Sequence, residues 1–179
     1  MSQLVEERQS IARRSDLKGS ERRALLSDAT DSWLRGLLTD AIAQHGADPA
    51  QFALLAVGGY GRREMSLGSD IDVVLVHEPS ALRVEDVASS LWYPIWDSKI
   101  ALDHSVRTIA QARTLARDDF KVVLGLIDAR VVAGSTELGE SLRTGILGDW
   151  RASAGDRLVE LHATAMARRS RVGDLAQLL

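Results

Sequence analysis

Two short groups of residues have the types and spacing that bind phosphates and metal ions. The first is the stretch GGYG, in which Gly58, Gly59 and Gly61 follow an apolar run. The second is the acidic pair Asp70 and Asp72, which opens another apolar run. Carboxylates contribute nothing to an apolar core, and glycine weakens the strand that it ends. The pattern therefore predicts a binding site.

The acidic pair is expected to hold a divalent cation. Residues i and i+2 of a strand share a face, so both carboxylates point one way while Ile71 and Val73 point into the core. Two carboxylates this close disfavour each other's ionisation unless a cation lies between them. Mg²⁺ is commonly held by one or two carboxylates together with substrate phosphates. Asp70 and Asp72 are therefore candidate catalytic residues and metal ligands; two solvated carboxylates are the alternative.

The glycine stretch is expected to bind phosphate. Without a Cβ, the backbone amides of Gly58, Gly59 and Gly61 can approach an anion closely. A helical turn beginning near Tyr60 would add a favourable dipole. An ordinary tight turn is the alternative. With the metal on the acidic pair, this arrangement predicts a nucleoside triphosphate site.

Two polar residues beside these groups are further candidates for nucleotide binding. Arg62 could bind the triphosphate, or belong to a solvated arginine pair with Arg63. Ser69 could hydrogen-bond a phosphate, or cap the turn in front of the strand.

The elements that must position these groups are three predicted strands among helices. FALLAVGG and DIDVVLVHE read as strands, and ALDHSVRT alternates as a half-buried strand does. A first helical segment is predicted to end at Gly46, with Ser20 as an N-cap, and a second to run from Val84 to Lys99, with Trp92 and Trp96 in the core. Helices are also predicted from Ile109 through FKVVLGLIDARVVAG, and two or more helical pieces are expected after that stretch. The prediction is an α+β domain with a small mixed sheet and flanking helices. We expect a helical segment at 1–50, a core at 51–134 and a C-terminal helical segment at 135–179.

Composition excludes several classes of protein. The 179 residues are 45% hydrophobic and include no cysteine, so one soluble domain is expected, without disulfides or thiolate metal sites. A net charge of −3 argues against a nucleic-acid partner. The charged N-terminus lacks a signal peptide, and no apolar run is long enough to span a membrane. A cytoplasmic protein is expected.

The spacing of the glycine pair and the acidic pair resembles the signature of the nucleotidyltransferase superfamily that includes DNA polymerase β. GGYGRREMSLGSDIDVVLV is similar to the corresponding block of the bifunctional uridylyltransferase/uridylyl-removing enzymes (GlnD). LWYPIWDSKIALDHSVRT and ARDDFKVVLGLIDARVVAGSTEL resemble the blocks that follow it in that family. The resemblance covers roughly Ala53 to Leu138.

This resemblance implies a polymerase-β-like fold and Mg²⁺-dependent transfer of UMP from UTP, or AMP from ATP, to a tyrosine of the PII nitrogen-regulatory protein, releasing pyrophosphate. It also implies a third metal-binding carboxylate on an adjacent strand, for which Asp103 is the candidate. Asp103 is predicted to share a face with Ser105 and Arg107, opposite a structural His104. Other members carry the acidic residue at the position of Ala101.

Family members also contain a His-Asp phosphohydrolase domain and ACT domains, so this chain is expected to be the transferase portion only. Three other functions stay open on the sequence. They are a small stand-alone nucleotidyltransferase with another acceptor, a nucleotide-binding regulatory module without turnover, and an interaction scaffold in which the acidic pair is incidental.

Overall fold

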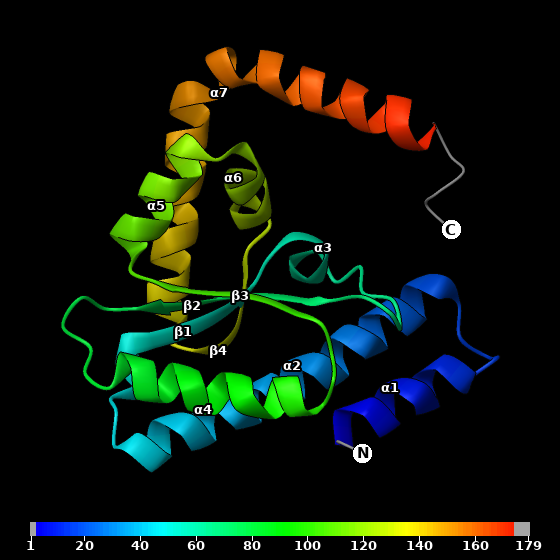
Figure 1. The fold of residues 1–179 in the computed structure, drawn as a ribbon, viewed down its shortest axis with the longest axis vertical. Coiled ribbons are helices and arrows are strands. Elements are labelled where there is room, and N and C mark those ends of the chain that lie inside the picture. Colours follow the sequence, from blue (N-terminus) through cyan, green and yellow to red (C-terminus); the bar gives the residue numbers. More distant parts are fainter. Residues whose placement is uncertain (1–2, 174–179) are drawn as a thin grey trace.

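This computed structural model describes residues 3–173 of the chain. These residues form a four-stranded sheet with helices on both of its faces (Figure 1). The elements in chain order are α1 (Gln3–Arg13), α2 (Gly19–His45), the 3-10 helix η1 (Pro49–Gln51), β1 (Phe52–Ala56), α3 (Gly58–Gly61), β2 (Ile71–His77), α4 (Val84–Asp97), β3 (Leu102–Arg107), α5 (Ile109–Asp118), α6 (Phe120–Ile127), β4 (Arg130–Gly134) and α7 (Thr136–Val172). The α+β class predicted from the sequence is confirmed. None of the helices within residues 3–173 has the length and apolar character required to cross a membrane.

The sheet has the strand order β3-β2-β1-β4. β1 pairs antiparallel with both β2 and β4, whereas β2 and β3 run parallel. Parallel neighbours require a crossover connection, which α4 supplies. Consequently the first residues of β2 and β3 lie side by side, next to the last residues of β1.

Each face of the sheet buries its own apolar cluster. α2 and α4 cover one face, with α1 packed on α2, and α5, α6 and α7 cover the other (Figure 1). Along β2, Val73 and Leu75 belong to the first cluster, whereas Val74 and Val76 belong to the second. Strand alternation therefore turns Asp72 toward the face of α5, α6 and α7.

Strand β4 is a correction to the sequence prediction. The stretch FKVVLGLIDARVVAG was expected to be one helix closed by Gly134, but α6 ends at Ile127 and residues 130–134 pair with β1. Gly134 has a φ of +80°, and a Cβ there would collide with the carbonyl oxygen of Phe52. The glycine therefore permits a close strand contact and does not end a helix.

Three predictions about the helices were also wrong. α2 begins at Gly19, and the Glu21 carboxylate accepts a hydrogen bond from the Lys18 amide at 2.8 Å, so Ser20 is not the N-cap. In the described part of the C-terminal segment, Thr136–Val172 form one helix, α7, which changes direction part-way along (Figure 1). Trp92 is buried, but Trp96 is 45% exposed.

Candidate active site

The parallel pairing of β2 and β3 places two aspartates opposite each other. Asp72 and Asp103 are register partners, and neighbouring strands lie about 4.8 Å apart. Both residues line one cavity on the side of α5 and α6. Ser105 and Arg107 line the same cavity. The ring of the intervening His104 packs on α4, so strand alternation confirms the predicted common face of Asp103, Ser105 and Arg107.

His104 points to the opposite side of β3, as predicted. Its ring packs against those of Trp92 and Trp96 on α4, with centroid distances of 4.9 and 5.5 Å. These contacts give His104 a structural role in attaching α4 to the sheet edge.

Asp70 directly precedes β2 and adds a third negative charge. Burial, followed by the charges of Asp103 and Asp70, raises the pKa of Asp72 above its ordinary value. Within residues 3–173, the three carboxylates have neither a hydrogen bond nor an ion pair to another side chain. Their negative charge is therefore left for a bound cation to compensate.

The donor set fits a hard divalent cation that is held partly by its substrate. Carboxylate oxygens are the ligands that Mg²⁺ prefers, and it commonly takes one or two of them with phosphates and waters. Among the described residues, no three acidic or histidine side chains form a cluster that could hold an ion alone. The facing pair Asp72 and Asp103 would supply the protein ligands, with Asp70 beside them.

The glycine turn lies against Asp72. The Val57 amide donates to the Asp72 carbonyl oxygen at 3.0 Å, which attaches the end of β1 to the start of β2. Gly58 has a φ of +57°, and a Cβ there would lie 3.7 Å from Oδ2 of Asp72. α3 begins at Gly58 and not near Tyr60, so the first two glycines themselves form the start of the helical turn.

Two cavities meet at Asp72. One has a volume of about 320 Å³ and is lined by Gly59, Ser69 and Asp70 as well. The other has a volume of about 410 Å³ and is lined also by Gly58 and Asp103. The structure thus brings together these predicted site residues: Gly58, Gly59, Ser69, Asp70, Asp72 and Asp103.

Ser69 belongs to the turn that leads into Asp70. Its hydroxyl oxygen accepts a hydrogen bond from the Ser66 amide at 2.8 Å and lies 3.0 Å from the Ser66 hydroxyl. This contact caps the turn, which is the structural alternative that the sequence left open.

Gly61 and Arg62 line a different cavity, of about 1050 Å³, beside β4. Arg62 forms ion pairs with Glu64 at 2.8 Å and Asp128 at 2.7 Å. A Cβ on Gly61 would collide with the carbonyl oxygen of Asp128. Arg62 would therefore have to leave two carboxylates to bind a phosphate near Asp72, and Gly61 is required for packing.

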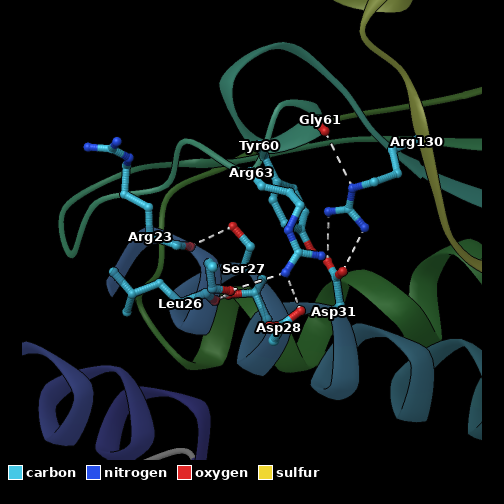
Figure 2. Close-up of polar contacts among 11 residues, drawn as sticks. Arg23, Leu26, Ser27, Asp28, Asp31, Tyr60, Gly61, Arg63 and Arg130 are labelled. Atoms are coloured by element: carbon cyan, nitrogen blue, oxygen red, sulfur yellow. Dashed lines mark hydrogen bonds and ion pairs between the residues drawn. The ribbon is translucent and has the colours of Figure 1, made fainter. Parts of the chain in front are cut away.

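A buried network that the sequence analysis missed holds the glycine turn to α2 (Figure 2). The Tyr60 hydroxyl donates to Asp31 at 2.5 Å, and Arg130 donates to both oxygens of that carboxylate at 2.6 and 3.0 Å. At the surface beside this network, Arg63 pairs with the exposed Asp28 one turn earlier on α2. Arg130 and Asp31 are 99 positions apart, so no local pattern could reveal the pair.

A buried arginine, which the sequence analysis also missed, supports the turn in front of Asp70. Arg8 of α1 is only 4% exposed. Its Nη2 donates to three carbonyl oxygens at 3.1 to 3.2 Å, those of Ser66, Leu67 and Ser69. Helix α1 therefore contributes to the site, although an arginine in a polar N-terminal helix gives no sequence signal of such a role.

Comparisons with known proteins identify the family of the chain. Residues 5–93 match the family model described as "Putative nucleotidyltransferase DUF294". The bifunctional uridylyltransferase/uridylyl-removing enzyme of Streptomyces coelicolor is 48% identical over 162 residues, which cover 90% of this chain and 19% of that protein. The chain belongs to this nucleotidyltransferase family. The Mycobacterium tuberculosis enzyme of the same name is 40% identical over 172 residues, covering 93% of this nucleotidyltransferase and 21% of the relative.

This chain spans about a fifth of the length of the curated relatives it matches, at 19% and 21%. The family description and the names of these relatives both specify nucleotidyl transfer. A crystal structure of a toxin–antitoxin with AMP-PNP aligns with this chain at a TM-score of 0.42 and 15% sequence identity. The alignment covers 75% of this chain and 98% of the chain in that crystal structure.

Proposed function

We propose that this chain transfers a nucleotidyl group to a tyrosine hydroxyl of a PII protein in the cytoplasm, with Mg²⁺ and UTP or ATP. The observation that carries the proposal is the register pairing of Asp72 with Asp103 beside Gly58, where neither carboxylate forms an ion pair with any residue of the described range 3–173. The relatives named uridylyltransferases support UTP as donor.

The proposed reaction is an in-line displacement at the α-phosphorus. The tyrosine oxygen bonds to that phosphorus, the bond to the bridging oxygen of pyrophosphate breaks, and the phenolic proton passes to solvent. Mg²⁺, when bound, would neutralise phosphate charge and orient the reacting oxygens. Asp72 and Asp103 would hold the ion, and Asp70 adds negative charge beside them.

The backbone of the glycine turn positions the triphosphate. The first amides of a helical turn have no intrahelical acceptor, so those of Gly58 and Gly59 can donate to phosphate oxygens. Ser69 and the turn that Arg8 supports hold Asp70 next to the same phosphates.

The test is calorimetric titration of UTP and ATP, each with and without Mg²⁺, into wild type and Asp72→Asn. We expect Mg²⁺-dependent binding that weakens at least about 100-fold in Asp72→Asn, because one ligand of the ion is lost. Asp97→Asn is the matched control, since Asp97 is exposed at the end of α4. A PII protein is then added, and its mass should rise by one nucleoside monophosphate on tyrosine. Equal binding by wild type and Asp72→Asn would exclude the proposed site.

A further inference from the structure

Strand β3 forms an open edge of the sheet, and it carries one of the two facing carboxylates. It is the outermost strand in the order β3-β2-β1-β4. None of its six residues is buried, whereas all five residues of β1 are. An edge strand presents unpaired backbone groups with which another extended chain can pair. A further strand can therefore be added to the sheet directly beside Asp103.

The register shows which backbone groups of β3 face outward. The Ile71 amide donates to the Ala101 carbonyl oxygen at 2.8 Å, and alternate residues of a strand direct their backbone groups to opposite edges. The backbone groups of Asp103 and Ser105 therefore bond to β2. Three residues direct theirs away from the sheet: Leu102, His104 and Val106. Within residues 3–173, no hydrogen bond satisfies these outward groups.

The α4 side of this edge has an exposed aromatic surface. Tyr93 is 60% exposed and Trp96 is 45% exposed, and their rings meet edge to face at a centroid distance of 5.4 Å. Trp96 also packs against the ring of His104 in β3. Large aromatic side chains are frequent anchors of protein interfaces. A strand added to β3 would place alternate side chains on this aromatic pair.

The opposite side of the edge has two cations without a partner. Arg107 is the last residue of β3, Lys121 lies in the first turn of α6, and both line the cavity that contains Asp103. Among the described residues, neither side chain has a hydrogen bond or ion pair. Their charges favour a partner segment that has an acidic residue on this side.

We propose that the acceptor tyrosine enters the site on an extended segment of the acceptor protein that pairs with the open edge of β3. The assignment rests on the proposed function and adds how the acceptor is bound. The triphosphate position is the glycine turn at the end of β1, so the two substrates approach Asp72 and Asp103 from opposite sides. A tyrosine directly opposite Asp103 would share its face of the sheet, with the Cβ atoms about 5 Å apart. An acidic residue four positions from the tyrosine would then lie opposite Arg107.

Amide hydrogen exchange, measured by NMR on the whole chain with and without a saturating PII protein, tests this pairing directly. The outward amides of Leu102, His104 and Val106 should exchange at least about tenfold more slowly in the complex. The amides of Asp103 and Ser105, which already bond to β2, should change less than about threefold. A bound PII protein that leaves the outward amides unprotected overturns the assignment, as does a wild-type chain that binds no PII protein.

A matched pair of variants isolates the backbone contribution. Val106→Pro removes an outward amide without breaking a hydrogen bond to β2, whereas Val106→Ala shortens the same side chain and keeps the amide. Calorimetry should show that Val106→Pro binds the PII protein about tenfold more weakly than Val106→Ala does. Unchanged Mg²⁺-dependent UTP binding establishes that both variants are folded at the site. Equal binding of the PII protein by the two folded variants would contradict strand pairing.

Side-chain variants test the two sides of the edge. Trp96→Ala should weaken binding of the PII protein about tenfold, and Arg107→Gln about threefold. Leu158→Ala is the control, because Leu158 is a 56% exposed apolar residue on α7, and it should match wild type. Binding that is unchanged in both Trp96→Ala and Arg107→Gln would place the acceptor elsewhere.

Failure of this inference is distinguishable from failure of the proposed function. Transfer of a nucleotide to the PII protein, with the outward amides of β3 unprotected, would retain the proposed function and reject only this mode of docking. Protection of those amides without any transfer in the presence of UTP or ATP and Mg²⁺ would retain the docking surface and reject the proposed reaction.

Discussion

Asp31 and Asp72 lie on opposite sides of the same glycine turn, and their surroundings differ in one respect. Asp31 is 6% exposed and accepts hydrogen bonds from Tyr60 and from two nitrogens of Arg130 (Figure 2). Asp72 is partly buried beside Asp70 and Asp103, and no cation of residues 3–173 pairs with it. The first carboxylate is satisfied by the fold, and the second is not.

The difference separates a structural charge from a functional one. The paired Asp31 attaches α2, the glycine turn and β4 to one another through its hydrogen bonds with Tyr60 and Arg130. The unpaired Asp72 keeps a raised pKa, which means that its charge opposes folding until a cation binds. The hydrogen bonds of Asp31 thus fix the glycine turn, which in turn borders the unpaired Asp72.

The largest effect on stability is expected when the hydrogen bonds and ion pair of Asp31 are removed. Arg130→Met leaves Asp31 buried without its cation, and loss of one partner of a buried pair should lower the free energy of unfolding by about 3 kcal/mol. Denaturation by urea measures this change. Arg62→Met removes an exposed arginine and should cost about 1 kcal/mol or less.

Adding Asp31→Asn to Arg130→Met removes the unpaired charge and should recover part of the loss. Equal stability of Arg130→Met and Arg62→Met would mean that the buried network contributes no more than surface pairs, and the contrast between Asp31 and Asp72 would fail.

A smaller effect is expected at Arg8. This residue belongs to α1, which packs on α2, and it donates hydrogen bonds to the turn before Asp70. Arg8→Met removes three hydrogen bonds to the turn before Asp70 and should lower the free energy of unfolding by about 2 kcal/mol. It should also weaken Mg²⁺-dependent UTP binding severalfold under conditions where the protein is folded. Arg8→Lys, which retains a charged donor, should restore part of the binding.

Arg13→Met is the control, since Arg13 is exposed on the same helix. If Arg8→Met loses stability while its UTP affinity equals that of wild type, then Arg8 supports the fold without positioning Asp70.

The smallest effect has the opposite sign. Because the pKa of Asp72 is raised on folding, the folded state binds more protons, and this residue's contribution to stability is lost as pH rises above the ordinary carboxyl range. Asp72→Asn should therefore raise Tm at pH 7 by about 2 °C, even though it removes nucleotide binding. Differential scanning calorimetry at pH 7 and pH 4 measures it. The gain should shrink at pH 4, and a lower Tm at pH 7 would show that Asp72 already has a partner.

Local patterns predicted the part of the site that depends on strand alternation. The common face of Asp103, Ser105 and Arg107 and the inward direction of Ile71 and Val73 follow from a period of two. The roles of Tyr60, Arg8 and Arg130 could not be predicted in this way, because each depends on a partner at least 29 positions away.

The fold shows the same division. β1 and β2 are bounded by glycine or proline, and β3 alternates polar and apolar residues along its length, so all three strands were predicted. β4 was missed because residues 120–134 form a nearly continuous apolar run that fits a helix locally. Only pairing with β1, and the room that Gly134 leaves for Phe52, makes its end a strand.

The register pairing of Asp72 with Asp103 also constrains how the length of the connection between α4 and β3 can vary. Residues 98–101 connect α4 to β3, and a change of one residue in their length would slide Leu102 or His104 opposite Asp72. A change of two residues would keep the same face of β3 toward the cavity. Homologues that differ in this connection are therefore expected to differ by an even number of residues, or to carry their acidic residue an even number of positions away.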